Sequence, residues 1–401
     1  MKTSQTYMDL EAKYGAKNYK PIPVVISKAK GIWVWDPEGK KYMDCLASYS
    51  AVNQGHLHPT IIKAVEDQIK VLTLTSRAFY NDRLGGFLKK LCEVSGLEVA
   101  LPMNTGAEAV ETGIKIARRW GYRMKNVPTN QAEIITCNNN FHGRTSTIVS
   151  FSTDEIARSD YGPFMPGFKT IPFDDTEALE QAITPNTVAF LVEPIQGEAG
   201  VIIPHAGYLK KVREICDRHN VLLITDEIQT GFCRTGKMFC FMHDNIKPDI
   251  LLVGKALGGG VIPVSAAISR KEIMDVITPG SHGSTFGGNP LGAAVAEASL
   301  DVLINEKLDE RSAELGAYFL TKIKEIDSPL FKEVRGKGLF IAIQLTDEAG
   351  DARPYTEALK EKGLLAKETH VHTVRLAPPL VIKKEEIDWA LSILKEVFSS
   401  K

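Results

Sequence analysis

The fold is decided by two apolar runs, Val221-Leu-Leu-Ile-Thr-Asp226-Glu227 and Asp249-Ile-Leu-Leu-Val-Gly-Lys255-Ala-Leu-Gly-Gly-Gly260. Short apolar runs bounded by turn signals are typical of buried parallel strands. The first run ends at the carboxylate of Asp226, and the second is followed by Lys255 and glycines. Residues just past the carboxyl ends of such strands line the crevice in which open α/β sheets bind ligands. We therefore expect Asp226 and Lys255 to face one pocket.

These two side chains indicate a specific chemistry when they share a pocket. A lysine in a partly dry pocket loses its proton more easily than in water and can form a Schiff base with a carbonyl. A buried aspartate can hold a proton on a pyridine nitrogen and so make the ring an electron sink. Together, Lys255 and Asp226 suggest a pyridoxal phosphate site.

The composition excludes several other classes of protein. The chain has 401 residues, 44% of them hydrophobic, which allows a large core and favours two or more domains. A net charge of −1 gives no sign of a nucleic acid or membrane partner. The six cysteines form no C-x-x-C pair, so we expect neither a metal site nor a disulfide framework. With no apolar signal core and no membrane-length run, we expect a cytoplasmic protein.

Strand-like runs alternate with helical patterns from about residue 99 to residue 267, which favours a mainly parallel sheet covered by helices. We divide the chain into an N-terminal segment (1–50), a large α/β domain (51–302) and a C-terminal part (303–401). The first and last parts would together build a smaller α+β domain. The runs that we expect to be strands are Ile134–Cys137, Thr147–Phe151, Val188–Val192, Val221–Thr225, Ile250–Val253, Val264–Ile268, Lys337–Leu345 and Thr373–Leu376.

Two small, hydroxyl-rich loops precede helical patterns. In the first, Thr105, Gly106 and Ala107 are candidates for a phosphate cradle, because free N–H groups and the helix dipole attract anions. The alternative is an ordinary helix N-cap. In the second loop, Ser284 and Thr285 offer hydroxyl donors to the same phosphate, and the alternative is a flexible turn.

Other candidate site residues follow predicted strands. Phe141 is placed to stack on an aromatic ring, and Arg144 to clamp a carboxylate bidentately, although a core aromatic beside a surface arginine is the simpler alternative. Glu193 and Glu198 follow a strand and belong to the same rim as Asp226. Arg375 is a lone cation inside an apolar strand, where a cation is rarely buried unless it is paired.

In combination, these motifs resemble the class III, or ω-type, aminotransferases of the fold-type I pyridoxal phosphate enzymes. The resemblance covers nearly the whole chain, from Asn18-Tyr19 to Pro379. It implies a large domain with a mainly parallel seven-stranded sheet, a smaller α+β domain and a homodimer with shared active sites. The segments that carry it are 104–109, 141–145, 193–200, 225–231, 254–260 and 283–290.

The resemblance also implies a role for each residue of the site. Lys255 would carry the cofactor and shuttle a proton, Asp226 would pair with the pyridinium nitrogen, and Gln229 would contact the phenolic oxygen. The residues expected around the ring are Phe141, His142 and Ile228. The phosphate would be held by Thr105, Gly106 and Ala107, and from the neighbouring subunit by Ser284 and Thr285.

Within this family, the pair Tyr19 and Tyr49 resembles members that use L-ornithine as the amino donor and 2-oxoglutarate as the acceptor. That resemblance implies δ-transamination to L-glutamate 5-semialdehyde, which cyclises to pyrroline-5-carboxylate, with L-glutamate as the second product. Tyr19 would hold the α-amino group of ornithine and Arg144 its α-carboxylate. The other expected substrate-binding residues are Tyr49, Glu193, Glu198 and Arg375. Acetylornithine, 4-aminobutyrate or another ω-amine stays open as the donor.

Overall fold

The computed structural model describes residues 3–399 of the chain. Its centre is a seven-stranded sheet in the order β4-β10-β9-β8-β7-β5-β6. Strand β10 is antiparallel to β4 and β9, and the other neighbours are parallel. The prediction of a mainly parallel α/β sheet is therefore confirmed. The strands are β4 (Val99–Met103), β5 (Glu133–Cys137), β6 (Phe168–Ile171), β7 (Thr187–Val192), β8 (Leu222–Asp226), β9 (Ile250–Val253) and β10 (Ser265–Ser269).

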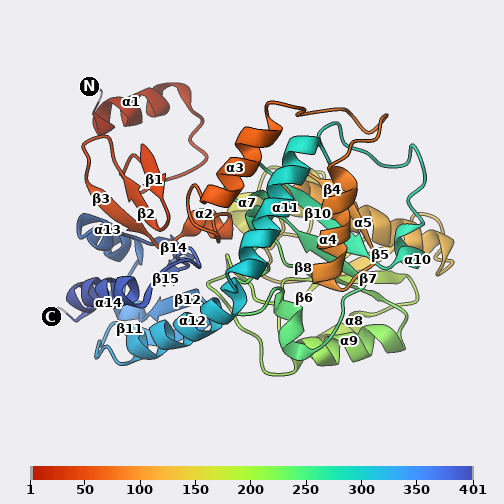
Figure 1. The fold of residues 1–401 in the computed structure, drawn as a ribbon. Helices are drawn as coiled ribbons and strands as arrows, with labels where there is room; N and C mark the ends of the chain where they lie inside the picture. The colour runs from red at the N-terminus through yellow and green to blue at the C-terminus, as the bar shows by residue number, and fades with distance from the viewer. Residues whose placement is uncertain (1–2, 400–401) are drawn as a thin grey trace.

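Helices cover both faces of this sheet (Figure 1). Alternate residues of β8 enter different cores: Ile224 packs with Ile114 of α5, whereas Leu223 packs with Val212 of α9. Because both faces are buried, the strands have continuous apolar sequences, and each fully buried leucine or isoleucine contributes roughly 2 kcal/mol. The covering helices are α3 (Pro59–Gln68), α4 (Leu84–Ser95), α5 (Gly106–Arg123), α8 (Thr176–Ala182), α9 (Tyr208–Arg218) and α11 (Pro290–Asn305).

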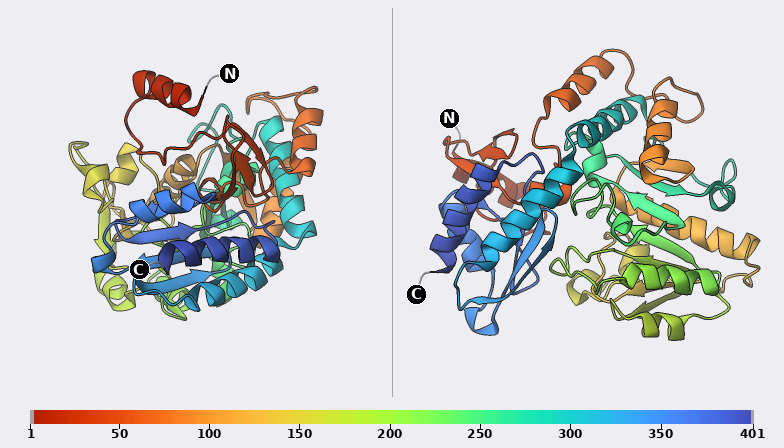
Figure 2. Two further views of the ribbon diagram at one scale, coloured as in Figure 1. Left: turned by 90° about the vertical axis from the view of Figure 1, so that its left-hand side faces the viewer. Right: turned by 60° about the horizontal axis from the view of Figure 1, so that its bottom comes forward.

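The two ends of the chain lie at the same side of the molecule, away from the large sheet (Figures 1 and 2). One four-stranded sheet, β1-β2-β3-β13, combines residues from both ends, and a second has the order β11-β12-β15-β14. The strands are β1 (Lys28–Lys30), β2 (Trp33–Trp35), β3 (Lys41–Asp44), β11 (Phe331–Lys337), β12 (Phe340–Leu345), β13 (Leu364–Leu365), β14 (Lys367–Thr369) and β15 (Thr373–Leu376). The helices here are α1 (Ser4–Tyr14), α12 (Leu308–Lys324), α13 (Arg353–Glu361) and α14 (Lys384–Phe398).

Short helical turns join the larger elements. They are α2 (Ala47–Ser50), α6 (Ser146–Val149), α7 (Glu155–Arg158), α10 (Lys271–Met274) and the 3-10 turns η1 (Cys240–Asp244), η2 (Lys255–Gly258) and η3 (Asp347–Ala349). Turn η2 directly follows β9, so Lys255 leaves the sheet at a sharp bend and has a φ of 47°. No helix within residues 3–399 has the length and apolar character needed to cross a membrane.

One predicted strand is wrong. Residues Thr147–Phe151 were expected to be extended, but Ser146–Val149 form helix α6. The Thr145 hydroxyl accepts a hydrogen bond from the Ile148 amide and caps this turn. Ile148 and Phe151 are buried in either conformation, so a short apolar run did not reveal which one forms.

Two strands were missed, and one predicted strand is interrupted. Strands β4 and β6 were not predicted; β4 contains Pro102, which an edge strand tolerates. The predicted strand Lys337–Leu345 is broken at Gly338, which has a φ of +58° and joins β11 to β12. A Cβ at Gly338 would lie 2.5 Å from the carbonyl carbon of Thr235. This close approach to the backbone requires glycine.

Candidate active site

A cavity lies beyond the carboxyl ends of β7, β8 and β9. Asp226 is the last residue of β8, and β8 pairs with β9 in parallel, so Lys255 leaves the neighbouring strand at the same edge. Both side chains line the cavity, as the two apolar runs predict. The complete lining is Gly106, Ala107, Phe141, His142, Gly143, Glu193, Ile195, Asp226, Ile228, Gln229, Thr230 and Lys255.

Asp226 is fully buried and has two hydrogen-bond partners. Its Oδ2 lies 2.7 Å from Nδ1 of His142, and its Oδ1 accepts a bond of 3.1 Å from the Ile228 amide. His142 is also buried, and its Nε2 has no partner among the described residues. Burial lowers the pKa of His142, but the hydrogen bond and the charge of Asp226 outweigh it and raise that pKa overall. This pair places the Asp226 carboxyl group beside an imidazole in the cavity wall.

Among the residues that line the cavity, Lys255 is the one with a primary amine. Burial is the main reason that its pKa is lowered, and the positive charge of Arg375 adds to the effect. Glu198 and Asp226 oppose that change without reversing it. A lowered pKa increases the fraction of neutral amine, which is the form that attacks a carbonyl.

The start of α5 forms an anion site at the cavity wall. Thr105 is its N-cap and forms a capping box with Glu108, so the ordinary capping role is present. The amides of Gly106 and Ala107 donate no hydrogen bond to any described residue, yet both residues line the cavity. A Cβ at Gly106 would lie 3.1 Å from Ile228, which explains why this position has no side chain. Helix α5 is 18 residues long, so its dipole favours an anion here.

Phe141 and Glu193 form another part of the wall. The Phe141 amide donates a bond of 3.0 Å to Oε2 of Glu193, which anchors the loop that follows β5 to the end of β7. Burial, together with the charge of Asp226, raises the pKa of Glu193 to about 7 although His142 acts in the opposite direction. Glu193 is therefore a buried carboxyl group that titrates near neutral pH.

An ion pair between a buried arginine and a partly exposed glutamate lies beside the cavity. Nη1 of Arg375 lies 2.7 Å from Oε1 of Glu198, and Nε2 of Gln229 donates a bond of 3.1 Å to the same oxygen. Arg375 is fully buried, whereas the Glu198 side chain is 28% exposed. The guanidinium of Arg375 lies 5.3 Å from the centre of the Tyr49 ring. Burial tends to raise the pKa of Glu198, but Arg375 and Lys255 lower it overall, so the carboxylate stays ionised.

Eight predicted site residues do not line the cavity: Tyr19, Tyr49, Thr105, Arg144, Glu198, Ser284, Thr285 and Arg375. Arg144 is exposed, with its guanidinium 5.0 Å from the Phe141 ring and Nη1 3.6 Å from Asp154. Tyr19 is 75% exposed. The Ser284 hydroxyl accepts a 3.0 Å bond from the Asn104 side chain, next to the start of α5, and Thr285 is exposed.

Some residues of the site were not predicted. Gly143, Ile195 and Thr230 line the cavity, and the Thr369 hydroxyl donates a hydrogen bond to the carbonyl of Glu198. Gly143 has a φ of 128°, and a Cβ there would lie 2.9 Å from Ile148. Gly143 could have been predicted from its place between two candidate site residues, His142 and Arg144. Nothing in the sequence indicated Thr369, because its role depends on a contact with a residue 171 positions away.

The cavity residues fit pyridoxal phosphate. Gly106 and Ala107 present free amides for a phosphate, and Asp226 presents a buried carboxylate for a ring nitrogen. The amine of Lys255, which makes no hydrogen bond to a described residue, is available to an aldehyde. The group would thus bring together donors that the protein itself leaves unsatisfied. Within residues 3–399, no cluster of potential ligands suits a metal ion.

Comparison with known proteins agrees with this chemistry. Residues 14–398 match the aminotransferase class-III family. The chain is 61% identical to an ornithine aminotransferase of Brevibacillus brevis, over 99% of each chain. A crystal structure of the ornithine aminotransferase from Toxoplasma gondii, described with partial occupancy of PLP at its active site, has a TM-score of 0.98. That protein is 48% identical, with 99% of this chain and 94% of the other covered.

A further solved structure bears on substrate choice. It is described as an acetylornithine aminotransferase from Elizabethkingia anophelis, has a TM-score of 0.90 and is 48% identical over 100% of both chains. Fold and overall identity therefore leave the amino donor to be argued from individual residues. The family itself is established, because its match spans nearly the full length and the residues of its chemistry share one cavity. The chain belongs to the class-III aminotransferases, enzymes that depend on pyridoxal phosphate.

Proposed function

We propose that this aminotransferase moves the δ-amino group of L-ornithine to 2-oxoglutarate. The products are L-glutamate and L-glutamate 5-semialdehyde, which cyclises to pyrroline-5-carboxylate. The observation that carries this proposal is the ion pair between the buried Arg375 and the partly exposed Glu198. The names of the related proteins from Brevibacillus brevis and Toxoplasma gondii support it.

The ion pair answers a problem that the two substrates pose. 2-Oxoglutarate reacts at the carbon beside its α-carboxylate, whereas ornithine must react at the opposite end of the molecule. An arginine that always bound an α-carboxylate would direct the α-amino group of ornithine to the reacting centre. Glu198 neutralises Arg375 in this structure, and its partly exposed side chain has room to move away. The paired state accepts a distal amine, and the open state accepts the keto acid.

The rim residues complete the donor site in this proposal. Tyr19 would bind the α-amino group of ornithine, and Arg144 its α-carboxylate. Arg144 is exposed, and its Asp154 partner is at 3.6 Å, so little free energy opposes its release to a substrate. Tyr49 shapes the pocket beside Arg375, where burial raises the pKa of its phenol and keeps that phenol neutral.

In the reaction, pyridoxal phosphate supplies an electron sink and stores the amino group between the two halves. Asp226 holds the proton on the ring nitrogen, supported by His142. Lys255 moves the proton at the reacting carbon through its Nζ, with an amine already biased toward the neutral form. Gln229 orients Glu198 through their hydrogen bond while the donor is bound.

The proposed function is tested by the half-reaction without a keto acid. Holoenzyme is mixed separately with L-ornithine, N-acetylornithine and 4-aminobutyrate, and the cofactor absorbance is followed. Both other amines lack the free α-amino group that Tyr19 would bind, and 4-aminobutyrate is also one carbon too short to place its carboxylate on Arg144 in the same way. Each should therefore react at least about 100-fold more slowly than L-ornithine. Pyrroline-5-carboxylate is then identified by NMR. If N-acetylornithine reacted as fast as L-ornithine or faster, acetylornithine would be the amino donor instead.

The Glu198→Ala variant tests the ion pair in the same assay. With Arg375 permanently unpaired, ornithine can bind with its α-carboxylate on that arginine. The share of α-transamination, seen as the isomeric pyrroline-2-carboxylate, should rise by about tenfold. The reason is that Arg375 would then bind the α-carboxylate of ornithine in place of Glu198. Glu198→Gln, which keeps a hydrogen-bond acceptor, should fall between wild type and the alanine variant. An unchanged ratio of the two products in both variants would rule out this function of the pair.

We further propose a homodimer in which Ser284 and Thr285 serve the neighbouring active site. Exposed apolar side chains, which mark interfaces, gather near this loop. They are Ile69, Val71, Leu74, Phe79, Tyr80 and Phe286. Asn81 donates a bond of 3.5 Å to the Gly288 carbonyl, so the two segments adjoin. Sedimentation of the holoenzyme should give twice the chain mass of 44.1 kDa; a monomer that is fully active would contradict the shared site.

A further inference from the structure

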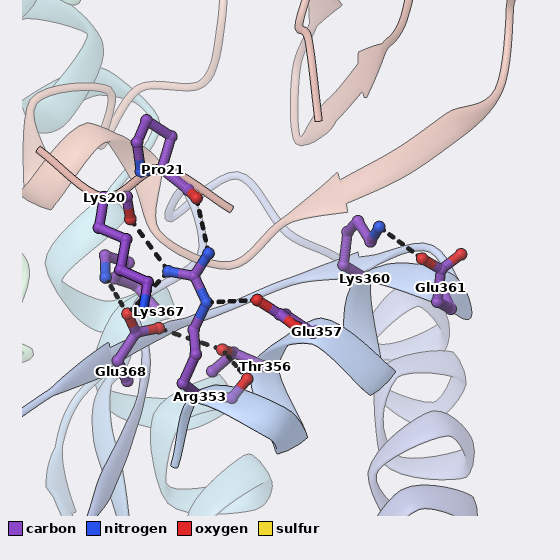
Figure 3. A network of polar contacts seen from close by, with 9 residues as sticks. All are labelled: Lys20, Pro21, Arg353, Thr356, Glu357, Lys360, Glu361, Lys367 and Glu368. Carbon is purple, nitrogen blue, oxygen red and sulfur yellow. Dashed lines mark hydrogen bonds and ion pairs between the residues drawn. The ribbon is translucent and has the colours of Figure 1, made fainter. Parts of the chain in front are cut away.

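Arg353, the first residue of α13, connects the two ends of the chain (Figure 3). Its Nη1 donates a bond of 3.0 Å to the Lys20 carbonyl, and its Nη2 donates a bond of 2.6 Å to the Pro21 carbonyl. The same guanidinium pairs with Glu357 at 2.6 Å and with Glu368 at 3.1 Å. The Arg353 side chain is mostly buried, and four of its five N–H donors form these bonds.

These bonds hold a segment that has few other attachments. Within residues 3–399, the only hydrogen bonds that join residues 16–26 to the rest of the chain come from Arg353. Val24 adds an apolar contact with the core of the small sheet. Tyr19 belongs to this exposed segment and immediately precedes Lys20. The bonds from Arg353 to the Lys20 and Pro21 carbonyls therefore fix the position of the neighbouring Tyr19.

The other end of the network reaches the ion pair of the active site. Glu368 lies on β14, and its neighbour Lys367 pairs in register with Arg375 on β15. Thr369, the next residue of β14, donates a hydrogen bond to the carbonyl of Glu198. Thr356 donates a 3.1 Å bond to Oε2 of Glu368 and keeps this carboxylate in place. Arg353 thus attaches the segment of Tyr19 to the strand next to Arg375.

The backbone between the attachment and Tyr19 is stiff. Pro21 has a fixed φ, and it restricts the residue before it, Lys20, to extended conformations. Pro23 restricts Ile22 in the same way. Because this short connection is stiff, the position of the Lys20 and Pro21 carbonyls also determines where the Tyr19 side chain lies. A flexible connection would leave that side chain free to move.

We propose that Arg353 is a positioning residue for the amino donor, because it holds the Lys20–Pro21 backbone and thereby places Tyr19 at the mouth of the site. This inference rests on the proposed function, in which Tyr19 contacts the donor. 2-Oxoglutarate binds through Arg375 and does not use Tyr19. The effect of Arg353 is therefore confined to one of the two half-reactions.

The test uses Arg353→Lys in the holoenzyme. A lysine keeps the positive charge but cannot donate to two carbonyls in a fixed fork. The ornithine concentration for half-maximal rate should rise about tenfold, the factor that corresponds to about 1.4 kcal/mol. The maximal rate of that half-reaction and the constant for 2-oxoglutarate should stay within about twofold of wild type. The matched control is Arg118→Lys, because Arg118 donates a 2.8 Å bond to the Pro166 carbonyl in another loop.

Two more variants keep the test decisive. Pro21→Gly retains Arg353 but loosens the backbone, so it should raise the ornithine constant selectively as well. In the double variant Tyr19→Phe with Arg353→Lys, the ornithine constant should match that of the worse single variant, because both changes act through one contact. Trypsin should cleave after Lys17, in the segment that Arg353 holds, faster in Arg353→Lys than in wild type and the control.

Each outcome separates this inference from the function on which it rests. If Tyr19→Phe impairs ornithine but Arg353→Lys and Pro21→Gly do not, the positioning role is overturned and ornithine transamination stands. If Arg353→Lys affects both substrates equally, Arg353 has only a general structural role. If Tyr19→Phe leaves ornithine turnover intact, the donor role of Tyr19 is lost, and the inference is lost with it.

Discussion

Replacing Lys255 with alanine is expected to abolish transamination, with a fall in rate of about four orders of magnitude in either half-reaction. The variant would lose the amine that we propose carries the cofactor and also the base that we propose moves the proton. No other residue that lines the cavity has a primary amine with which to replace it.

A chemical readout accompanies the rate. Reduction of wild-type holoenzyme with borohydride should fix the cofactor to the peptide that contains Lys255, and mass spectrometry should find no such adduct in Lys255→Ala. The control is Lys247→Ala, because Lys247 is an exposed lysine outside the cavity. Activity above a tenth of wild type in Lys255→Ala, or an adduct on another lysine, would refute the assignment.

Asp226→Asn is expected to lower the rate by about a thousandfold while the fold is retained. Asparagine has almost the same volume and can still accept the bond from Ile228, but it has no charge with which to hold a proton on the ring nitrogen. It also disturbs the 2.7 Å contact with His142. The measurement is the rate of cofactor absorbance change with saturating ornithine.

The comparison for Asp226→Asn is Asp244→Asn, a substitution of the same kind in the 3-10 turn η1, outside the cavity. That control should behave as wild type. A normal rate in Asp226→Asn would mean that the carboxylate is structural. The neighbouring Glu227 would not then take over, because it accepts bonds from Thr230, Cys240 and Phe241 on the opposite side of the strand.

The contrast between Asp226 and Glu227 illustrates how much could be read from sequence. Successive side chains of a strand point to opposite faces, so only one of two adjacent carboxylates can enter the pocket. The preceding apolar run located the strand end, and both Asp226 and Lys255 line the cavity as predicted. Burial raises the pKa of Glu227 to about 7, yet this buried carboxyl group only anchors a loop. A perturbed pKa alone would have selected the wrong residue.

Errors arose where local pattern is ambiguous or where distant segments meet. Residues Thr147–Phe151 are apolar in a strand or a helix, and the cap at Thr145 decides for the helix. Strand β4 was not predicted because it contains Pro102, a residue that a sheet tolerates at its edge, where β4 lies. Arg144 and Tyr19 are exposed and do not line the cavity, and their roles as substrate contacts stay predictions.

The sequence by itself determined the class of fold and the cofactor, and it predicted that Asp226 and Lys255 carry out the chemistry. These features depend on short-range patterns, in which a strand buried on both faces must be apolar and must end where polar groups can reach a ligand. Only the tertiary structure decided which distant residues meet. Glu198 pairs with Arg375 across 177 positions, and Arg353 holds Pro21 across 332. Such contacts depend on how sheets and chain ends pack together, and no local periodicity records that packing.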